Sequence, residues 1–502
     1  MALKKFSYGK DPLTLESSMK ILNGDLNCHI EKDVLEKINN SRENIESIIK
    51  SGDKIYGVNT GIGTLCSTII SNEDSSLLQE NLLKSHAVGV GKSVPMEISK
   101  LMLILKTHSL CKGFSGIRID VIERICWHIE KDIIPVVPSQ GSVGASGDLA
   151  PLAHLFLPLI GKGKLLYKGK EFETKKVLDQ EKKLPLKLKE KEGLALINGT
   201  QFISAFTCFA LDKYKNCLIN ADIISAFSIE ATKSSLKPFS RKIQELRPYN
   251  GSSRVINRIN DLLLGSQILE SHRDCDKVQD PYSIRCIPQV HGASWDAYFH
   301  LKNTLEIELN SVTDNPIIID RKEVISGGNF HGQPIAMPID YNVLAASEIG
   351  NISDRRIFLL LEGNDVVPKL LIKKTGVNSG FMILQYTSAA LTSENKNLCF
   401  PASADSITTS LGQEDHVSMG SIGAVKFLNV LENLEKILAI ELICSTQAMD
   451  FLKPLKSSKK INKCHDHIRS KINHCKKDKI FTKDIDSAIG IIKSKKLIEL
   501  TG

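Results

Sequence analysis

The chain has 502 residues, of which 42% are apolar and 24% are charged, with 65 basic and 57 acidic side chains and a formal net charge of +8. This length allows two to four domains and a sizeable apolar core. The longest nearly apolar stretch, residues 149–160, is interrupted by Pro151, His154 and Pro158. It is too short and too broken for a membrane span, so a membrane-spanning protein is excluded.

Two further features of the composition bear on location and partners. The first ten residues lack the apolar core of a secretory signal, and the twelve cysteines follow no regular framework, so we expect a cytoplasmic protein with reduced thiols. Much of the excess basic charge lies in residues 453–479 and 493–496 without interleaved aromatic residues. This pattern favours a solvated lysine-rich face and no nucleic-acid partner.

Taken in chain order, the periodic patterns predict mainly helices. Short strands are expected at residues 164–167 and 316–319, and the charged segment 175–191 is expected on the surface. Apolar residues at steps of three and four predict long helices in 295–309 and 417–452, and an apolar-rich helix in 343–361. The predicted fold class is mainly α, a bundle of long helices with short β-hairpins.

One glycine-rich turn carries unusual chemistry. Residues 141–154 read Gly-Ser-Val-Gly-Ala-Ser-Gly-Asp-Leu-Ala-Pro-Leu-Ala-His. If the backbone is forced tightly enough, the nitrogen of Gly147 attacks the carbonyl carbon of Ala145, because glycine tolerates strained angles. Loss of water from the ring and from the Ser146 hydroxyl leaves a conjugated methylene that accepts nucleophiles. The alternative is a plain helix start, with Asp148 as the cap and Pro151 in the first turn.

Further motifs accompany this turn in a fixed order over nearly the whole chain. The motifs are Tyr-Gly-Val-Asn-Thr-Gly-Ile-Gly at 56–63, Ser-His at 85–86, Glu-Gly-Leu-Ala-Leu-Ile-Asn-Gly-Thr-Gln at 192–201, Val-Gln-Asp-Pro-Tyr-Ser-Ile-Arg-Cys at 278–286, Ser-Gly-Gly-Asn-Phe-His at 326–331 and Gln-Glu-Asp-His-Val-Ser-Met at 413–419. Together with the turn, they resemble the ammonia-lyase family that carries a self-made methylidene-imidazolone group, and the branch of it that acts on histidine in particular.

The resemblance implies the cofactor, the domains and the assembly. It implies a 4-methylidene-imidazol-5-one formed autocatalytically from Ala145, Ser146 and Gly147, with no dissociable cofactor. It implies a smaller N-terminal lobe, residues 1–110, carrying Tyr56 and His86, followed by a helical bundle domain, residues 111–502. It also implies a homotetramer whose active sites combine residues from three chains.

The same resemblance gives roles to residues from distant segments. Arg285 offers a planar fork for an amino-acid carboxylate, with Asn198 and Gln279 as amide partners of the carboxylate or of the ring carbonyl. Tyr56 removes or helps remove the β-proton, which requires its pKa to be depressed by positive groups such as Arg285. Tyr282 supports the prosthetic group, and Phe330 is expected near the substrate.

Substrate choice depends on His86, Gln413 and Glu414, which the resemblance assigns to the side-chain pocket. An imidazole and a carboxylate suit histidine, and an unpaired buried carboxylate disfavours a phenyl ring by several kcal/mol. Leu411-Gly412 departs from the Ala-Asn that is common before Gln-Glu in bacterial histidine enzymes, and residues 330–334 mix features of different branches. Both departures leave the detail of the pocket open.

The leading hypothesis is elimination of ammonia from L-histidine to give trans-urocanate, the first step of histidine degradation, with Tyr56 or Glu414 as the base. The alternatives are a tyrosine or phenylalanine ammonia-lyase, an aminomutase that returns ammonia to the β-carbon, and a non-catalytic homologue. Cysteine and histidine residues at 464–467 and 474–475 superficially suggest zinc, but their spacing does not match the usual paired motifs, so no metal is expected.

Overall fold

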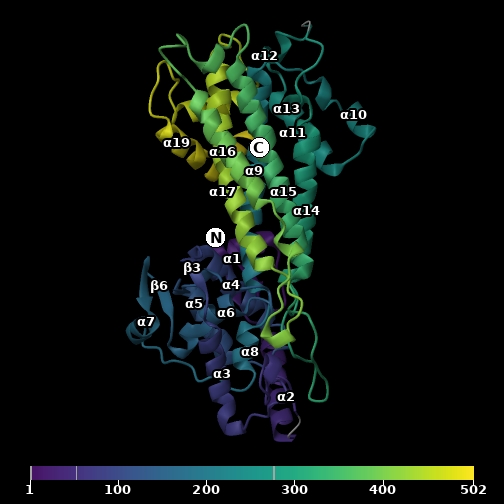
Figure 1. Ribbon diagram of the computed structural model, residues 1–502, viewed down its shortest axis with the longest axis vertical. Helices are drawn as coiled ribbons and strands as arrows, with labels where there is room; N and C mark the ends of the chain where they lie inside the picture. Colours follow the sequence, from purple (N-terminus) through teal and green to yellow (C-terminus); the bar gives the residue numbers. More distant parts are fainter. Residues whose placement is uncertain (1–2, 52–53, 275–276) are drawn as a thin grey trace. The chain divides into compact units, whose positions relative to one another are not determined.

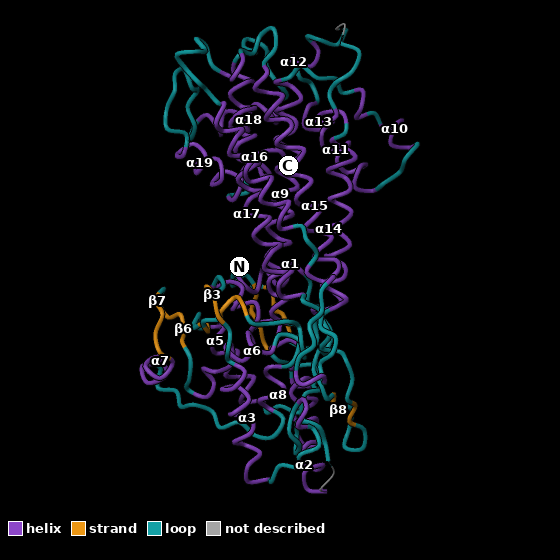
Figure 2. The backbone as a smooth tube through the Cα atoms, viewed as in Figure 1, coloured by secondary structure: helices purple, strands orange, loops and turns teal. Residues whose placement is uncertain are grey.

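The computed structural model describes residues 3–51, 54–274 and 277–502 (Figure 1). Helices dominate it and the strands are short (Figure 2), which confirms the predicted mainly α fold class. Within the described residues, none of the helices combines the length and the apolar character needed to cross a membrane.

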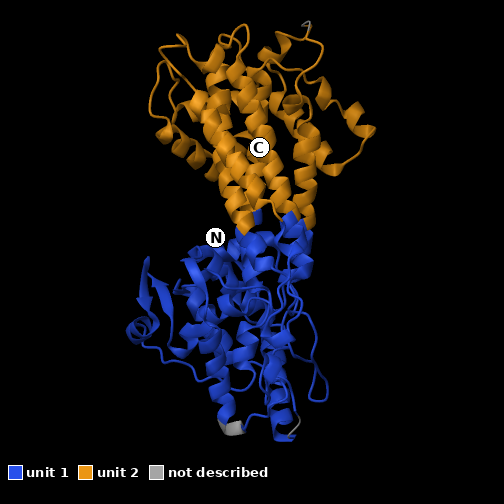
Figure 3. Cartoon of the chain, viewed as in Figure 1, with its two compact units in different colours: residues 1–211, 301–340, 401–425 blue, residues 212–300, 341–400, 426–502 orange. Residues whose placement is uncertain are grey.

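The chain divides into two compact units, each assembled from three segments of sequence (Figure 3). Unit 1 holds residues 1–211, 301–340 and 401–425, and unit 2 holds residues 212–300, 341–400 and 426–502. The expected lobe 1–110 lies wholly in unit 1, whereas the expected bundle 111–502 contributes residues to both units. The domain boundary at residue 110 stays a prediction.

Unit 1 contains short helices and four small sheets. Strand β1 (Lys4–Ser7) pairs in parallel with β2 (Leu26–His29), and β3 (Val90–Ser93) pairs antiparallel with β5 (Pro138–Gln140). The predicted strand at 164–167 is confirmed as β6 (Lys164–Tyr167), between β4 (Ile134–Pro135) and β7 (Lys170–Glu173). The predicted strand at 316–319 is reduced to β8 (Ile317–Ile318), which pairs with β9 (Val324–Ile325). The helices of this region are α1 (Leu15–Leu22), α2 (Lys32–Ser51), α3 (Asn72–His86), α4 (Met96–Leu110), α5 (Ile119–Glu130), α6 (Leu149–Phe156), α7 (Thr174–Gln180) and α8 (Glu192–Ile197).

Helix α4 is the centre of unit 1. Every residue from Ile98 to Leu110 is buried, and the helix packs against α1, α5 and α6. A helix that is buried on all sides has no solvated face for charge. Lys106 and His108 nevertheless lie on it and are buried. These two polar residues therefore need specific partners inside the unit.

Four long helices contribute residues to both units: α9 (Gln201–Ala231), α14 (Ile287–Leu309), α15 (Gln333–Glu362) and α17 (Gly420–Asp450). The helices predicted at 295–309, 343–361 and 417–452 are confirmed by α14, α15 and α17. Helix α9 was missed because nearly all of its residues are buried, so no polar stripe marks its period.

Unit 2 holds a chain of fully buried ionic groups on these helices. Asp222 of α9 bonds His291 of α14 at 2.8 Å, and Arg356 of α15 donates to Glu441 of α17 at 2.6 and 2.9 Å. Arg356 also donates to the second ring nitrogen of His291 at 3.5 Å. Burial lowers the pKa of His291, so its ring joins Asp222 and Arg356 by hydrogen bonds, and Arg356 and Glu441 form the direct ion pair. These contacts fix the pairing of the four helices within this unit.

The remaining helices of unit 2 are shorter than these four. The helices are α10 (Arg241–Glu245), α11 (Asn250–Leu263), α12 (Gln267–Glu270), α13 (Tyr282–Arg285), α16 (Met382–Leu398), α18 (Lys459–Arg469), α19 (Thr482–Lys493) and α20 (Lys496–Thr501). The charged segment 175–191 belongs to unit 1, and most of its charged side chains are exposed, which confirms the expected surface position. Its last residue, Lys191, is fully buried and pairs with Asp314 at 2.8 Å. A buried lysine is tolerated there because its partner neutralises it.

The cysteine and histidine residues near the C-terminus form hydrogen bonds of their own. His465 and His474 both bond the carboxylate of Asp450, at 3.1 and 2.8 Å, and Cys464 is buried with its thiol against the carbonyl of Leu497. Across residues 3–51, 54–274 and 277–502, no group of three or more histidine, cysteine or acidic side chains is arranged to hold a metal ion.

Candidate active site

The Ala145-Ser146-Gly147 turn has a strained backbone. Ser146 has φ +49°, in the left-handed region, and Gly144 and Gly147 have φ +82° and +79°. A non-glycine residue in this region costs about 1–3 kcal/mol and persists only when its surroundings enforce it. The turn is therefore held in shape by what packs around it.

The backbone of Gly199 presses on one side of this turn. The amide of Gly199 donates to the carbonyl of Ser146 at 3.1 Å, and the amide of Asp148 donates to the carbonyl of Gly199 at 2.8 Å. A Cβ on Gly147 would lie 2.1 Å from the Gly199 carbonyl oxygen. Only glycine fits at residue 147, because any side chain would separate the two segments.

A second segment holds the opposite arm of the turn. The amide of Met419 donates to the carbonyl of Val143 at 3.0 Å, and the hydroxyl of Ser421 donates to the carbonyl of Ser142 at 2.8 Å. A Cβ on Gly144 would lie 2.3 Å from the hydroxyl of Ser418. The turn is thus compressed between two backbone segments from distant parts of the sequence.

Asp148 occupies the cap position of α6, and Pro151 lies in the first turn as predicted, but the Asp148 side chain does not cap its own helix. Its carboxylate instead accepts the amides of Phe202 and Ile203, both at 3.0 Å, at the start of α9. Complete burial raises the pKa of Asp148 to about 7, although these amides and Ser142 lower it. The carboxylate therefore ties the turn to α9.

Asn198 is buried where α8 ends, next to the compressing glycine. Its side-chain amide donates to the carbonyl of Asn315 at 2.8 Å. Its side-chain oxygen is buried and has no hydrogen-bond partner among the described residues. A buried acceptor without a partner is costly, and it suits a site that gains a donor from a ligand.

Tyr56 lies on the loop before α3, and its hydroxyl accepts the amide of Gly63 at 3.1 Å. Burial raises its pKa above the ordinary value, the bond from Gly63 lowers it, and the charge of Glu414 raises it further. The expectation of a depressed pKa is therefore not met by the described side chains of this chain. Arg285 was predicted to supply the positive charge that lowers the pKa of Tyr56. It belongs to unit 2 and is not among the groups that shift this pKa.

The charge of Glu414 affects the pKa of both Tyr56 and His86, the two residues of the N-terminal segment that were predicted to face the substrate. Its carboxylate accepts the hydroxyl of Thr409 at 2.9 Å. Burial lowers the pKa of His86, and the Glu414 charge partly offsets this change. The nitrogen Nδ1 of His86 lies 3.0 Å from the hydroxyl of Ser85. Glu414 is therefore within electrostatic reach of both Tyr56 and His86, and their place in one pocket stays a prediction.

The other residues predicted near the substrate in unit 1 are less enclosed. Gln413 is exposed beside Glu414, and Phe330 is half-buried just before α15. The short helix Ser410–Gly412 that precedes Gln413 contacts the short helix Gly63–Leu65 of the Tyr56 loop. The structure therefore brings the loops of Tyr56 and Glu414 together within unit 1.

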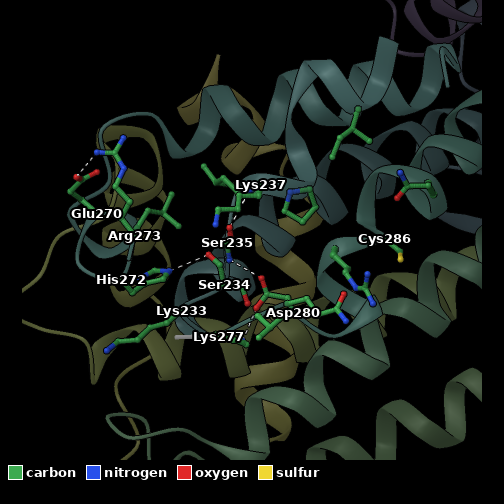
Figure 4. Close-up of a pocket in the computed structure, with 18 of the residues that line it drawn as sticks. Lys233, Ser234, Ser235, Lys237, Glu270, His272, Arg273, Lys277, Asp280 and Cys286 are labelled. Carbon is green, nitrogen blue, oxygen red and sulfur yellow. Dashed lines mark hydrogen bonds and ion pairs between the residues drawn. The ribbon is translucent and has the colours of Figure 1, made fainter. Parts of the chain in front are cut away.

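Gln279, Tyr282 and Arg285 form a separate group in unit 2. Gln279 and Arg285 line a pocket of about 760 Å³. Tyr282 is 70% exposed, and the Arg285 guanidinium lies 4.5 Å from the centre of its ring. The nitrogen Nε of Arg285 has no hydrogen-bond partner among the described residues. A guanidinium with free donors beside a pocket suits a carboxylate ligand. Asp280, buried in the same pocket, accepts the amide of Ser235 at 2.8 Å (Figure 4).

Three residues around the site were missed by the sequence reasoning. Thr409 holds Glu414, Asp148 joins the turn to α9, and Lys106 donates to the main-chain carbonyl of Asn198. Thr409 carries no signal in the sequence. Lys106 does carry one, because it directly follows five consecutive apolar residues at 101–105 in the sequence.

Known proteins are similar to this chain over most of its length. The aromatic amino acid lyase family matches residues 13–470. The histidine ammonia-lyase of Natranaerobius thermophilus is 44% identical over 482 residues, 95% of each chain, and that of Homo sapiens is 42% identical over 98% of this chain and 76% of its own.

Solved structures match over nearly the whole length. The histidine ammonia-lyase of Trypanosoma cruzi has a TM-score of 0.91 and 37% identity over 99% of this chain and 95% of its own. The tyrosine aminomutase of Streptomyces globisporus has a TM-score of 0.93 and 31% identity over 99% and 98%. With the family matched over most of the chain and the strained Ala-Ser-Gly turn in place, this chain belongs to the aromatic amino acid lyase family.

Proposed function

We propose that the protein eliminates ammonia from L-histidine and releases trans-urocanate, using a 4-methylidene-imidazol-5-one made from Ala145, Ser146 and Gly147. The observation that carries this proposal is the compressed turn, in which Gly199 fits against Gly147 only because neither residue has a Cβ. The curated relatives named histidine ammonia-lyase support the choice of histidine among the substrates of the family.

The residues of the turn fit this prosthetic group. Ring closure joins the Gly147 nitrogen to the Ala145 carbonyl carbon, and two molecules of water leave, one from the new ring and one from the Ser146 side chain. The positive φ values at Ser146 and Gly147 fold the chain back in the sense that closure requires. The finished group supplies an electrophile for an amine, which the ordinary side chains do not offer.

The chain's own residues bind the substrate and move its protons. Arg285 binds the carboxylate through its free guanidinium donors. Tyr56 or Glu414 takes the β-proton. Since burial raises the pKa of Tyr56, a Tyr56 base needs a positive charge from the substrate complex or from a second chain to ionise.

Glu414 and His86 select the imidazole ring of the substrate. A histidine ring both donates and accepts hydrogen bonds, so it satisfies a carboxylate and a second imidazole at once. A phenyl ring would leave Glu414 desolvated and unpaired at a cost of several kcal/mol. Gln413 and Phe330 complete the side of the site that faces the substrate, next to these two residues.

An aminomutase is the second candidate, because a solved tyrosine aminomutase matches almost the whole chain. Lyase and mutase share the electrophile and differ in whether ammonia leaves or returns to the β-carbon. Only the products distinguish them.

The test is incubation of the purified protein with L-histidine, L-tyrosine and L-phenylalanine, with Ser146→Ala as the control. Ammonia and urocanate in equal amounts from histidine alone, absent in the control, are the expected result. A β-amino acid without ammonia would establish the mutase instead. Turnover of tyrosine or phenylalanine alone would contradict the histidine assignment.

We further propose a cytoplasmic homotetramer in which each site combines residues from three chains, with the unit 1 residues of one chain and unit 2 residues of others. Co-expression of Ser146→Ala chains with Arg285→Ala chains tests this arrangement. Sites that draw Ser146 and Arg285 from different chains recover about a quarter of full activity in random mixtures, because each contribution is intact half of the time. Activity no higher than that of the two separate variants would contradict shared sites.

A further inference from the structure

Lys106 is a fully buried lysine that bonds the backbone segment packed against the electrophile turn. It lies on α4, where every residue from Ile98 to Leu110 is buried, and its ammonium donates to the main-chain carbonyl of Asn198. The next residue, Gly199, makes both hydrogen bonds that press on the turn. Lys106 is therefore one peptide unit away from the compressing contact and touches none of the atoms that form the ring.

The segment Asn198–Gly199 is enclosed on its other sides as well. A Cβ on Gly199 would lie 2.6 Å from the side-chain oxygen of Gln201 and 2.7 Å from the hydroxyl of Thr313. The Asn198 amide group is held by the carbonyl of Asn315. These contacts hold the segment on one side, and the turn holds it on the other. The hydrogen bond from Lys106 therefore limits any movement of the segment away from the turn.

The charges around Lys106 explain how a lysine is kept there. The neighbouring pair of Lys191 and Asp314 is fully buried at 2.8 Å, and the Asp314 and Asp148 carboxylates favour the charged form of Lys106. Burial is the larger effect and lowers the pKa of Lys106 to about 7. Placing a lysine here is thus unfavourable for folding, and such a residue is retained when its contact serves another purpose.

We propose that Lys106 is a positioning residue for ring closure: by holding the Asn198 carbonyl, it keeps Gly199 pressed against Ser146 and Gly147 in the geometry that brings the Gly147 nitrogen onto the Ala145 carbonyl. This inference rests on the proposed function, because it concerns the same prosthetic group. A small movement of Gly199 away from the turn relaxes the backbone of the turn. The rate of intramolecular attack then falls steeply, because the reacting atoms are misplaced.

Ring closure is measured by mass rather than by activity. Full-length protein is purified at intervals after the start of expression, and the peptide containing residues 141–154 is examined for the loss of two water molecules. In Lys106→Met we expect the rate of closure to fall by at least about tenfold relative to the unchanged protein. Lys106→Arg, which keeps a cationic donor, is expected to restore most of the rate.

Lys191→Met is the matched control, since it removes a buried lysine of the same neighbourhood that does not bond Asn198. It is expected to lower the melting temperature and to leave ring closure in the folded protein unchanged. If Lys106→Met does not fold, Lys106→Leu, which likewise lacks a donor, is measured in its place.

The outcomes separate the two proposals. Closure at the unchanged rate in folded Lys106→Met, or in Lys106→Leu if the methionine variant does not fold, overturns the role of Lys106 alone. Equal slowing in Lys191→Met also overturns it, because the effect would then belong to any buried lysine here. Absence of the ring from the unchanged protein overturns the proposed function, and this inference with it.

Discussion

Both units bury charged side chains, but the two sets have different surroundings. In unit 2, Asp222, His291, Arg356 and Glu441 lie on four regular helices and bond one another directly through their side chains. In unit 1, Lys106 and Asp148 bond main-chain groups next to a turn with positive φ. The first set joins regular elements, whereas the second controls the position of irregular backbone.

This difference separates groups that stabilise the fold from groups that prepare the chemistry. A direct ion pair between helices mainly determines which helices pack together. A charge that holds a main-chain carbonyl or amide determines where a segment of backbone lies, and main-chain position is what a self-made ring requires. Changes in unit 2 should therefore alter stability, and changes around the turn should alter ring formation.

The largest effect is expected for Gly199→Ala. Residue 199 has φ +124°, and an added Cβ would meet Gln201 and Thr313 at 2.6 and 2.7 Å. The segment must move away from the turn, so the ring should not close and activity should fall by at least about a thousandfold. Peptide mass and activity check this result. Gly169→Ala, at an open position with φ +75°, controls for the cost of the backbone conformation alone. Ring formation in folded Gly199→Ala would contradict the compression mechanism.

In unit 2, Arg356→Met should lower the free energy of unfolding by about 3–5 kcal/mol, because it leaves Glu441 buried without its cation. Adding Glu441→Leu should recover at least about half of this loss, since no uncompensated charge remains. Denaturant unfolding measures both variants. Peptide mass should find the ring intact in the folded protein. Loss of the ring without loss of stability would contradict the view that the buried charges of unit 2 affect stability alone.

Sequence reasoning succeeded where a pattern is local or carries unusual chemistry. The stripes in residues 295–309 and 417–452 predicted long helices, because a half-buried helix shows its period in the sequence. The Ala145-Ser146-Gly147 turn was identified by its glycines, since only they permit the close backbone approach that the structure contains. In both cases the residue types themselves indicate the local structure around them.

It failed where a residue's role depends on a distant partner. Helix α9 is buried all round and therefore lacks a polar face to reveal it. Asp148 was assigned to its own helix, but it accepts amides more than fifty residues away along the chain. The pKa of Tyr56 was expected to fall, and burial with Glu414 raises it. No spacing in the sequence encodes these long-range contacts.

A buried titratable residue in unit 1 that does not touch the turn should affect stability alone. Burial lowers the pKa of His108 from its ordinary value of 6.5 to about 4, and Gly9 donates to its nitrogen Nδ1 at 3.1 Å. Between these values the unfolded chain binds the extra proton and the folded chain does not, so stability falls as the pH is lowered. The loss is about 3 kcal/mol.

His108→Gln should remove most of this pH dependence, whereas His300→Gln, at an exposed position, should retain it. Denaturant unfolding between about pH 7 and pH 4 compares the variants, over the window that the two pKa values define. Peptide mass should find the ring in both. An unchanged pH dependence in His108→Gln would mean that other groups dominate acid unfolding.

The smallest effect concerns the orientation of Glu414. Thr409→Val keeps the shape of the side chain and removes the hydroxyl that donates to Glu414 at 2.9 Å. We expect kcat/KM for histidine to fall by about fivefold, corresponding to about 1 kcal/mol, because the carboxylate loses one donor and some of its orientation. Thr409→Ser should restore the rate, since it keeps the hydroxyl. Stability and ring formation should remain unchanged in both variants, because neither Thr409 nor Glu414 touches the compressed turn. A fall in ring content in Thr409→Val would show that the two functions of unit 1, electrophile formation and substrate selection, are coupled through the 409–419 segment that also bonds Val143.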